Sequence, residues 1–228
     1  MSLVKLSKKT QNVLKNFSTI NKSIIIDSGS KIRTLSVNRN IFASATVSEV
    51  FPQQVPIYDL GVFLSSLSLF EDPIFDFRNP QKLITTDETS NAKGTFYYSD
   101  PTMITQAPDK AIKMPEVDVE FNLRTDVLAD LLRAASVYQV TDLCLYNNDD
   151  EIRLQVCDKK NETSNTYSVP VGKNDSSDEF CYCFKVENLK LLPGDYSVRV
   201  AKNKVSHFVS EANNIEYYIA LEPDTKWY

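Results

Sequence analysis

The stretch LSKKTQNVLKNF, residues 6–17, has the spacing of an amphipathic helix. Its apolar residues recur at helical intervals and would share one buried face: Leu6, Val13, Leu14 and Phe17. The opposite face is a row of basic and amide side chains: Lys5, Lys8, Asn12 and Lys15, with Lys9 at its edge. We therefore predict a helix that packs through one side and presents a positive ridge on the other.

This lysine ridge stands out because the chain is acidic, with a formal net charge of −5. Residues 1–26 hold five lysines and no Asp or Glu, so the rest of the chain is left with 20 of the 25 basic and all 30 acidic residues. A solvated helix face usually mixes both signs, whereas a one-signed ridge repels itself unless an anion offsets it. Phosphate is the natural anion, and lysines contact it as point charges without reading bases.

The rest of the sequence shows the same order of elements twice. Alternating apolar residues predict strands at 23–27, 31–37, 41–48, 74–78, 82–87 and 94–99, and again at 142–147, 151–157, 166–171, 179–184, 196–201, 204–210 and 215–222. Helical spacing occurs at 58–70, 121–137 and 185–195. Three prolines between residues 100 and 117 indicate an extended connector. We predict two similar α+β domains, 1–105 and 117–228, joined by residues 106–116.

Composition argues against an enzyme and against a membrane protein. Hydrophobic residues make up 42% and charged residues 24%, as in ordinary globular domains. The sequence has no 18-residue apolar run and no signal-peptide pattern, so we expect an intracellular protein. Its five glycines are isolated and build no phosphate-binding loop, and the one histidine, His207, is expected at a surface or strand edge. We expect no catalytic residue, no cofactor and no metal.

Aromatic and sulfur-bearing residues are expected in the cores. The tyrosine pairs at 97–98 and 217–218 lie in strand-like segments and do not form a stacking platform for single-stranded nucleic acid. The four cysteines, Cys144, Cys157, Cys181 and Cys183, lie in apolar runs of the second half. We interpret them as buried free thiols and not as a zinc site.

Five blocks, residues 5–21, 56–70, 129–142, 188–198 and 217–224, give the chain a wider resemblance. In this order they resemble the sliding clamps that serve as DNA polymerase processivity factors of T-even-type bacteriophages. The resemblance implies two clamp-type domains per subunit and a homotrimeric ring, with helices inside and antiparallel sheets outside. Double-stranded DNA would pass through the ring, without sequence preference. The implied partners are the replicative DNA polymerase and a clamp-loader ATPase, in the cytoplasm of the infected bacterial host.

The resemblance also assigns residues to two surfaces. The DNA-facing residues would be Lys5, Lys8, Lys9, Lys15, Arg124, Arg133, Lys185 and Lys190. Asp126 and Asp130 offset the two arginines, so the second domain would add less positive field. A pocket for partner peptides would be lined by Ile112, Met114, Pro115, Ile219, Leu221 and Pro223.

Two other functions stay open at this point. The chain could be a non-enzymatic phage structural or assembly protein built from duplicated β-rich domains, with the lysines facing a protein partner. It could also be a monomeric DNA-binding protein without sequence preference. The first alternative predicts no retention on DNA, and the second predicts equal binding to linear and circular DNA.

Overall fold

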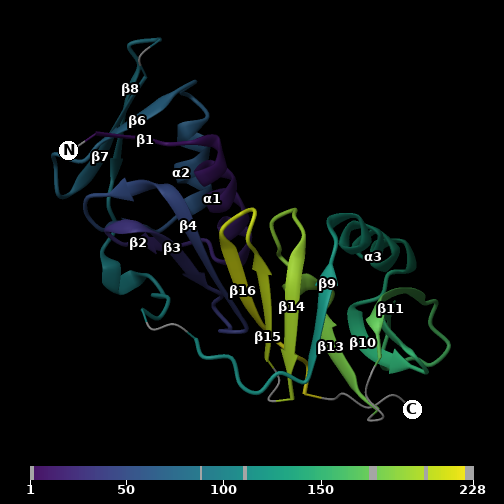
Figure 1. Ribbon diagram of the computed structural model, residues 1–228. Coiled ribbons are helices and arrows are strands. Elements are labelled where there is room, and N and C mark those ends of the chain that lie inside the picture. Colours follow the sequence, from purple (N-terminus) through teal and green to yellow (C-terminus); the bar gives the residue numbers. More distant parts are fainter. Residues whose placement is uncertain (1–2, 88, 110–111, 175–178, 203–204, 224–228) are drawn as a thin grey trace. The chain divides into compact units, whose positions relative to one another are not determined.

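The computed structural model describes residues 3–87, 89–109, 112–174, 179–202 and 205–223 (Figure 1). The chain divides into two compact units, Met1–Ala111 and Ile112–Tyr228. Within the described residues each unit combines antiparallel sheets with one or two α-helices. None of these helices is long and apolar enough to cross a membrane.

Unit 1 holds a four-stranded antiparallel sheet of order β1-β6-β7-β8, and two smaller pairings, β3 with β4 and β2 with β5. Its elements are β1 (Leu3–Lys5), α1 (Lys8–Ile20), β2 (Ile24–Ile26), β3 (Gly29–Leu35), β4 (Ile41–Phe51), β5 (Val55–Ile57), α2 (Leu60–Leu67), β6 (Pro73–Asp76), β7 (Lys82–Asp87), β8 (Lys93–Tyr97) and a 3₁₀ turn (Pro101–Met103).

The two helices of unit 1 pack against each other, and α1 also packs on β4. Val13, Leu14 and Phe17 of α1 are fully buried. In α2 the buried Phe63 ring lies 5.9 Å from the ring of Phe75 and 5.0 Å from that of Phe96. Tilted and edge-on aromatic pairs of this kind add to the free energy gained by burial. This core fixes which side of α1 remains in solvent.

Unit 2 holds two antiparallel sheets, of order β12-β11-β10-β13 and β9-β14-β15-β16, and one α-helix in its described part. Its elements are β9 (Val119–Leu123), α3 (Thr125–Tyr138), β10 (Asp142–Asn148), β11 (Glu151–Cys157), β12 (Tyr167–Lys173), β13 (Cys181–Lys185), a 3₁₀ turn (Val186–Asn188), β14 (Tyr196–Ala201), β15 (Val205–Ser210) and β16 (Ile215–Ala220).

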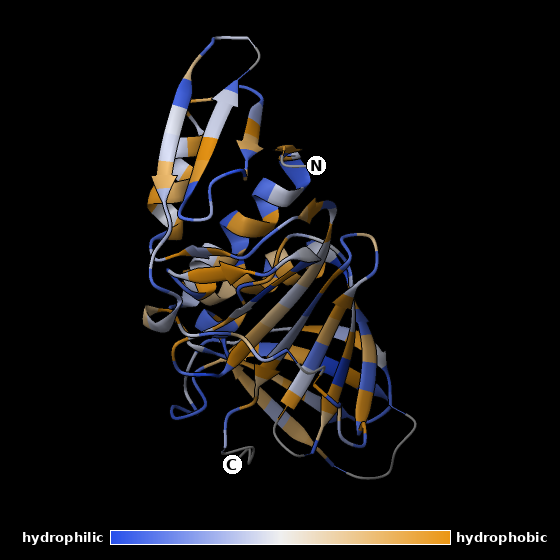
Figure 2. Ribbon diagram, turned by 90° about the vertical axis from the view of Figure 1, so that its left-hand side faces the viewer, coloured by the Kyte–Doolittle hydropathy of each residue, from blue (hydrophilic) through white to orange (hydrophobic). Residues whose placement is uncertain are grey.

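Alternation along the strands builds the core of unit 2. Figure 2 shows apolar and polar bands following one another along many of the arrows. Leu143 and Leu145 of β10 and Leu154 and Val156 of β11 are buried, as period-2 patterning requires. The rings of Tyr196, Phe208 and Tyr217 join three neighbouring strands through edge-on contacts.

The structure confirms two similar α+β domains and most of the expected elements, but three features differ. Residues 121–123 belong to β9 and not to a helix, because Phe121 and Leu123 alternate around the exposed Asn122 and pair with β14. The helix expected at 185–195 is only the 3₁₀ turn at 186–188. The three-residue strands β1 and β5 were not predicted, since so short a run carries no period. Residues 110–111 of the expected connector and Lys204 of an expected strand lie outside the described residues.

Two aromatic positions also differ from expectation. His207 is buried in β15, a strand flanked by β14 and β16, and not at a surface or edge. Its ring stacks on Tyr218 at 4.1 Å, and its Nε2 lies 3.0 Å from a carboxylate oxygen of Glu216. Tyr97, expected in a core, is 68% exposed on β8, because it points to the face opposite to Phe96, whose ring packs on Phe63.

Candidate nucleic-acid interface

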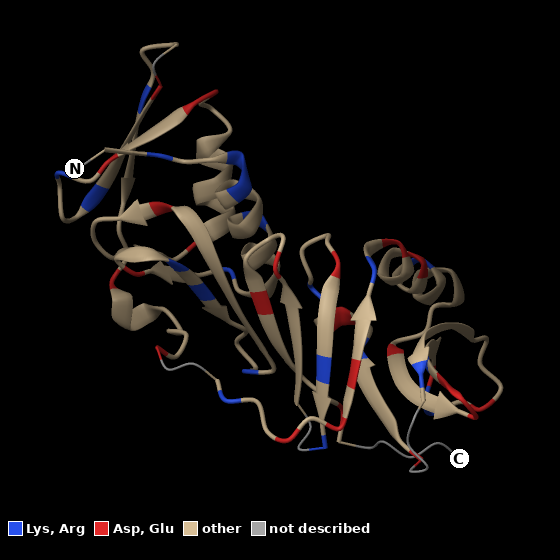
Figure 3. Cartoon of the chain, in the orientation of Figure 1, with Lys and Arg blue, Asp and Glu red and all other residues tan. Residues whose placement is uncertain are grey.

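The lysine ridge is the exposed side of α1. Lys8, Lys9, Asn12, Lys15 and Thr19 are exposed, while the other side of the helix is buried. Lys22 is also exposed, but it follows the extended residue Asn21 and is not part of the helix. Among the described residues, neither Lys8 nor Lys15 forms an ion pair. Figure 3 shows basic and no acidic colouring on α1.

The start of α1 is fixed by a buried carboxylate. Ser7 caps the helix, and its hydroxyl accepts a hydrogen bond from the Thr10 amide at 3.2 Å. Glu49 of β4 accepts from the Ser7 amide at 2.6 Å and from the Thr10 hydroxyl at 2.5 Å. A negative group here also suits the positive end of the helix dipole. Burial raises the pKa of Glu49, but the hydrogen bonds from Thr10 and Ser7 lower it more, so it lies below its usual value.

Lys5 does not belong to this ridge. It lies in β1, before the helix begins, and its Nζ is 2.8 Å from a carboxylate oxygen of Asp72. An open groove of about 690 Å³ lies at this corner, and Lys5, Lys8, Glu49 and Asp72 are among its lining residues. The first turn of α1 is therefore bordered by both signs of charge. The one-signed surface is confined to Lys8, Lys9, Lys15 and Lys22.

The exposed face of α3 is electrically balanced. Arg124 lies 2.9 Å from Asp126, and Arg133 lies 2.6 Å from Asp130. Both arginine side chains remain at least 69% exposed, so water screens these pairs and their free energy is small. Acidic and basic colouring both mark α3 in Figure 3. The structure therefore confirms that aspartates accompany the arginines, as the sequence indicated.

The other two basic candidates are Lys185 and Lys190. They lie in the segment 185–195, where the expected helix is only a 3₁₀ turn. Lys185, at the end of β13, lies 2.6 Å from Asp142, whose side chain is only 1% exposed. Burial lowers the pKa of Lys185, but the hydrogen bond and charge of Asp142, with Glu222 and Asp158, raise it more. Lys185 thus neutralises a buried carboxylate. Lys190 is half-buried in the segment after the 3₁₀ turn.

The residues expected in a partner-peptide pocket fall into three groups. Ile112, Met114 and Pro115 are half-buried in an extended segment, and Pro223 is exposed. Leu221 is 6% exposed, and Ile219 is fully buried because it shares the core side of β16 with Tyr217. Tyr218 lies on the other side, where its hydroxyl donates to the carbonyl of Ile112 at 3.1 Å. The sequence analysis missed Tyr218, although strand alternation in IEYYI indicates that it points away from the core side.

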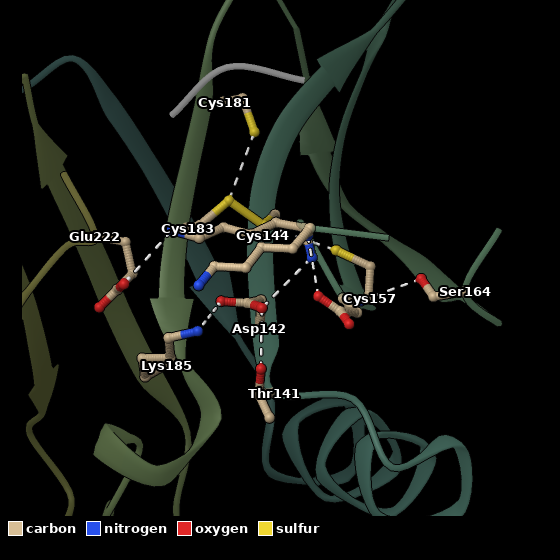
Figure 4. The surroundings of a disulfide bond; sticks show 12 residues. Thr141, Asp142, Cys144, Cys157, Ser164, Cys181, Cys183, Lys185 and Glu222 are labelled. Atoms are coloured by element: carbon tan, nitrogen blue, oxygen red, sulfur yellow. Dashed lines mark hydrogen bonds and ion pairs between the residues drawn. A yellow bond between two sulfur atoms is a disulfide. The ribbon is translucent and has the colours of Figure 1, made fainter. Parts of the chain in front are cut away.

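The expected set of four free thiols is wrong. Cys144 and Cys183 form a disulfide between the directly paired positions of β10 and β13 (Figure 4). Cys157 is a buried free thiol, as expected, whereas Cys181 is a reduced thiol that is only partly buried. The sequence did not indicate this disulfide, because the bonded cysteines are 39 positions apart.

Solved structures with this fold define its class. The PCNA of A. fulgidus, bound to a FEN-1 C-terminal region, superposes with a TM-score of 0.73 at 11% identity, over 99% of this chain and 100% of that chain. Proliferating Cellular Nuclear Antigen from Entamoeba histolytica gives 0.72 at 12% identity, over 96% and 98%. The two-domain fold described above is thus that of the DNA clamps of the PCNA type.

Sequence relatives are more specific. The family described as DNA polymerase processivity factor matches residues 5–96, and that of the gp45 sliding clamp C-terminal domain matches residues 120–223. The sliding clamp of Vibrio phage KVP40 is 33% identical over 96% of this chain and 99% of its own length. That of Enterobacteria phage T4 is 32% identical over 97% and 98%. The chain belongs to the sliding clamp family of phage DNA polymerase processivity factors, which confirms the resemblance.

The Glu49→Gln variant tests the anchoring of α1. The glutamine side chain is neutral and has one acceptor oxygen, so one of the Ser7 and Thr10 donors faces an NH2 group and loses its acceptor. The free energy of unfolding should therefore fall by about 1–3 kcal/mol. The folded pKa of Glu49 lies below its unfolded value, so its contribution is complete above the unfolded pKa and disappears as pH falls through the folded one. Urea unfolding at neutral pH and between about pH 5 and pH 3 measures both effects.

The matched control is Glu162→Gln, which changes an exposed glutamate. It should leave the unfolding free energy within about 0.5 kcal/mol. Equal stability of Glu49→Gln and Glu162→Gln at all pH values would contradict the anchoring role.

Proposed function

We propose that this protein is a sliding clamp without catalytic activity that encircles duplex DNA and tethers the replicative DNA polymerase. The lysine ridge of α1, on a chain of the sliding clamp family, is the observation that carries the proposal. A clamp-loader ATPase would open and close the ring on DNA. We propose that the protein acts in the cytoplasm of the infected bacterial host.

The charge distribution supports loose tracking along DNA. Lys8, Lys9, Lys15 and Lys22 attract phosphates, while the net negative charge of the remaining chain opposes tight adsorption. Arg124, Arg133 and Lys190 form a secondary set, because aspartates reduce the field of the arginines. We leave Lys185 out of the proposed contact set because it neutralises a buried carboxylate, and Lys5 because it lies in β1, outside the ridge. Contacts made only by lysines to the backbone would be independent of sequence.

Two sheet edges support a ring of identical subunits. β8 ends one sheet of unit 1 and β12 ends one sheet of unit 2, and each carries an exposed tyrosine, Tyr97 and Tyr167. Exposed aromatic side chains on unpaired edges are typical of interfaces. Pairing β8 of one subunit with β12 of the next is a heterologous contact, which closes into a ring when the rotation allows it. We propose this contact for a homotrimer.

A partner peptide would bind beside the segment 112–115. Its side chains Ile112, Met114 and Pro115 are half-buried and offer apolar surface, and the Tyr218 hydroxyl holds the backbone of Ile112 in place. Pro223 and the edge of Leu221 extend this surface at the end of the described chain. We propose that polymerase and clamp loader use this pocket, and we exclude Ile219 because it is fully buried.

Reversing two charges on the ridge tests the DNA-facing surface. In the Lys8→Glu/Lys15→Glu variant we expect faster dissociation from nicked circular DNA and a weaker dependence of the retention half-life on salt, because fewer phosphates are neutralised. The measurement is the retention half-life after loading, across a salt series. Lys31→Glu/Lys160→Glu makes the same change in net charge at exposed positions elsewhere and should behave as the wild type. Equal retention of the two variants would refute the assignment.

A proline on β8 tests the subunit interface. The Tyr98 amide donates to the Gln81 carbonyl at 3.0 Å, so by alternation the Thr95 amide points to the open side of the sheet. Thr95→Pro removes this donor and should raise the dissociation constant of the subunit interface by about tenfold. Light scattering across a concentration series should give about 78 kDa for the wild type, three times 25.9 kDa, and lower masses for the variant.

Thr95→Val keeps the amide and should preserve the mass of the wild type. A wild type that stays at 25.9 kDa at every concentration would contradict spontaneous ring formation. A Thr95→Pro variant as trimeric as the wild type would contradict the choice of β8.

Truncating two side chains tests the partner pocket. Ile112→Ala/Met114→Ala removes apolar surface that a hydrophobic anchor would contact, so binding of the polymerase should weaken by about tenfold or more. Calorimetric titration with the polymerase, together with primer-extension length, measures this effect. Val117→Ala, at an exposed position on the same segment, should change neither quantity. Undiminished binding by the double variant would exclude this surface as the pocket.

A further inference from the structure

All four cysteines of the chain lie on one face of the sheet β12-β11-β10-β13. Cys144 is paired directly with Cys183, so both point to the same side. Cys181 lies two residues before Cys183, and Cys157 is paired with Asp142, two residues before Cys144. Side chains two residues apart share a face, which brings residues from three strands together. Figure 4 shows the sulfur atoms in a row from Cys181 to Cys157.

Three of these sulfur atoms form a compact group. The Sγ atoms of Cys144, Cys181 and Cys183 all lie within 4.8 Å of one another. The Cys181 and Cys183 sulfurs are 3.8 Å apart. Thiolates around a tetrahedral ion with bonds of about 2.3 Å are separated by about 3.8 Å, so this pair already has the spacing of two metal ligands. Cys144 reaches that spacing only after its bond to Cys183 is reduced.

We propose that the reduced form of this cluster binds one thiophilic d¹⁰ metal ion through Cys144, Cys181 and Cys183. Reduction adds two electrons and two protons to the disulfide and yields two thiols, with a phosphine or dithiol as the reductant. Binding then releases the thiol protons as the thiolates coordinate the ion. The disulfide and the metal are alternative occupants of the same sulfurs. The site does not depend on the proposed clamp function.

The surroundings favour a cation over free thiolates. Cys144 and Cys183 are at most 3% exposed, and an unpaired buried anion is costly. The nearby ammonium groups are already engaged, Lys185 with Asp142 at 2.6 Å and Lys159 with Glu222 at 3.4 Å. A divalent ion would supply the missing positive charge. Cys181 is only partly buried, which gives an ion a route to the buried pair.

Cys157 is the matched control that the chain itself provides. Its sulfur is 3.9 Å from that of Cys144, but it lies outside the group of three. Among the four cysteines, only Cys144, Cys181 and Cys183 bring their sulfur atoms within 4.8 Å of one another. Replacing Cys157 should therefore spare the site.

The test is a titration of the full-length protein with Cd²⁺ after anaerobic reduction by a phosphine. We expect one Cd²⁺ per chain, with an ultraviolet thiolate-to-metal charge-transfer band. Cys181→Ser should weaken the affinity by more than about 100-fold, while Cys157→Ser should stay within about threefold of the wild type. The oxidised protein, with its disulfide intact, should give no band. Circular dichroism melting confirms that both variants are folded.

Three results would overturn the proposal. The first is a reduced, folded wild type that gives no charge-transfer band. The second is a Cys181→Ser variant that binds Cd²⁺ as tightly as the wild type. The third is a Cys157→Ser variant whose affinity falls as much as that of Cys181→Ser, which would centre the site on another set of sulfurs.

Discussion

The packing of α1 is the constraint on which the positions of the charged surfaces depend. Phe17, Leu14 and Val13 are fully buried, and the Glu49 carboxylate holds the first turn through Ser7 and Thr10. A helix fixed along one side and at one end cannot rotate about its axis. Lys8 and Lys15 must then lie in solvent, whatever the charge of the remaining chain. The apolar core of unit 1 therefore determines where the positive ridge lies.

Charge is organised differently on the two helices that carry basic residues. On α1 the lysines have no acidic residue near them in sequence, whereas on α3 each arginine lies beside an aspartate. Salt screens both surfaces, but only the first presents a net field to a polyanion. The two similar domains are thus unequal in electrostatics. If the chain closes into a ring, most of the attraction for phosphate comes from unit 1.

Sequence periodicity was sufficient for most of the fold. Alternating residues predicted the strands β7, β10 and β11, and helical spacing predicted α1 and α2. It failed where tertiary contacts decide, as in β9, whose three helical-looking residues pair with β14, and in the segment after Val186–Asn188. The boundaries of the connector stay a prediction.

The positions of the candidate-site residues were likewise predicted correctly where local spacing decides them, and wrongly where long-range contacts decide them. The exposed lysines of α1 could be identified from helical spacing alone, whereas the ion pairs of Lys5 and Lys185 join residues 67 and 43 positions apart. The same long-range pairing explains why the disulfide between Cys144 and Cys183 was missed. The burial of His207 was missed because nothing in its own segment shows that two strands flank it. The DNA and partner surfaces themselves remain proposals.

The most direct test of the clamp function is retention on DNA of different topology. The protein is loaded on nicked circular DNA by the clamp-loader ATPase, freed from the loader, and followed before and after one cut that makes the DNA linear. A ring that encircles DNA should remain on the circle and leave soon after the cut, because the open ends let it slide off. Equal retention on circular and linear DNA would show that binding is by surface attraction alone, and would contradict encirclement.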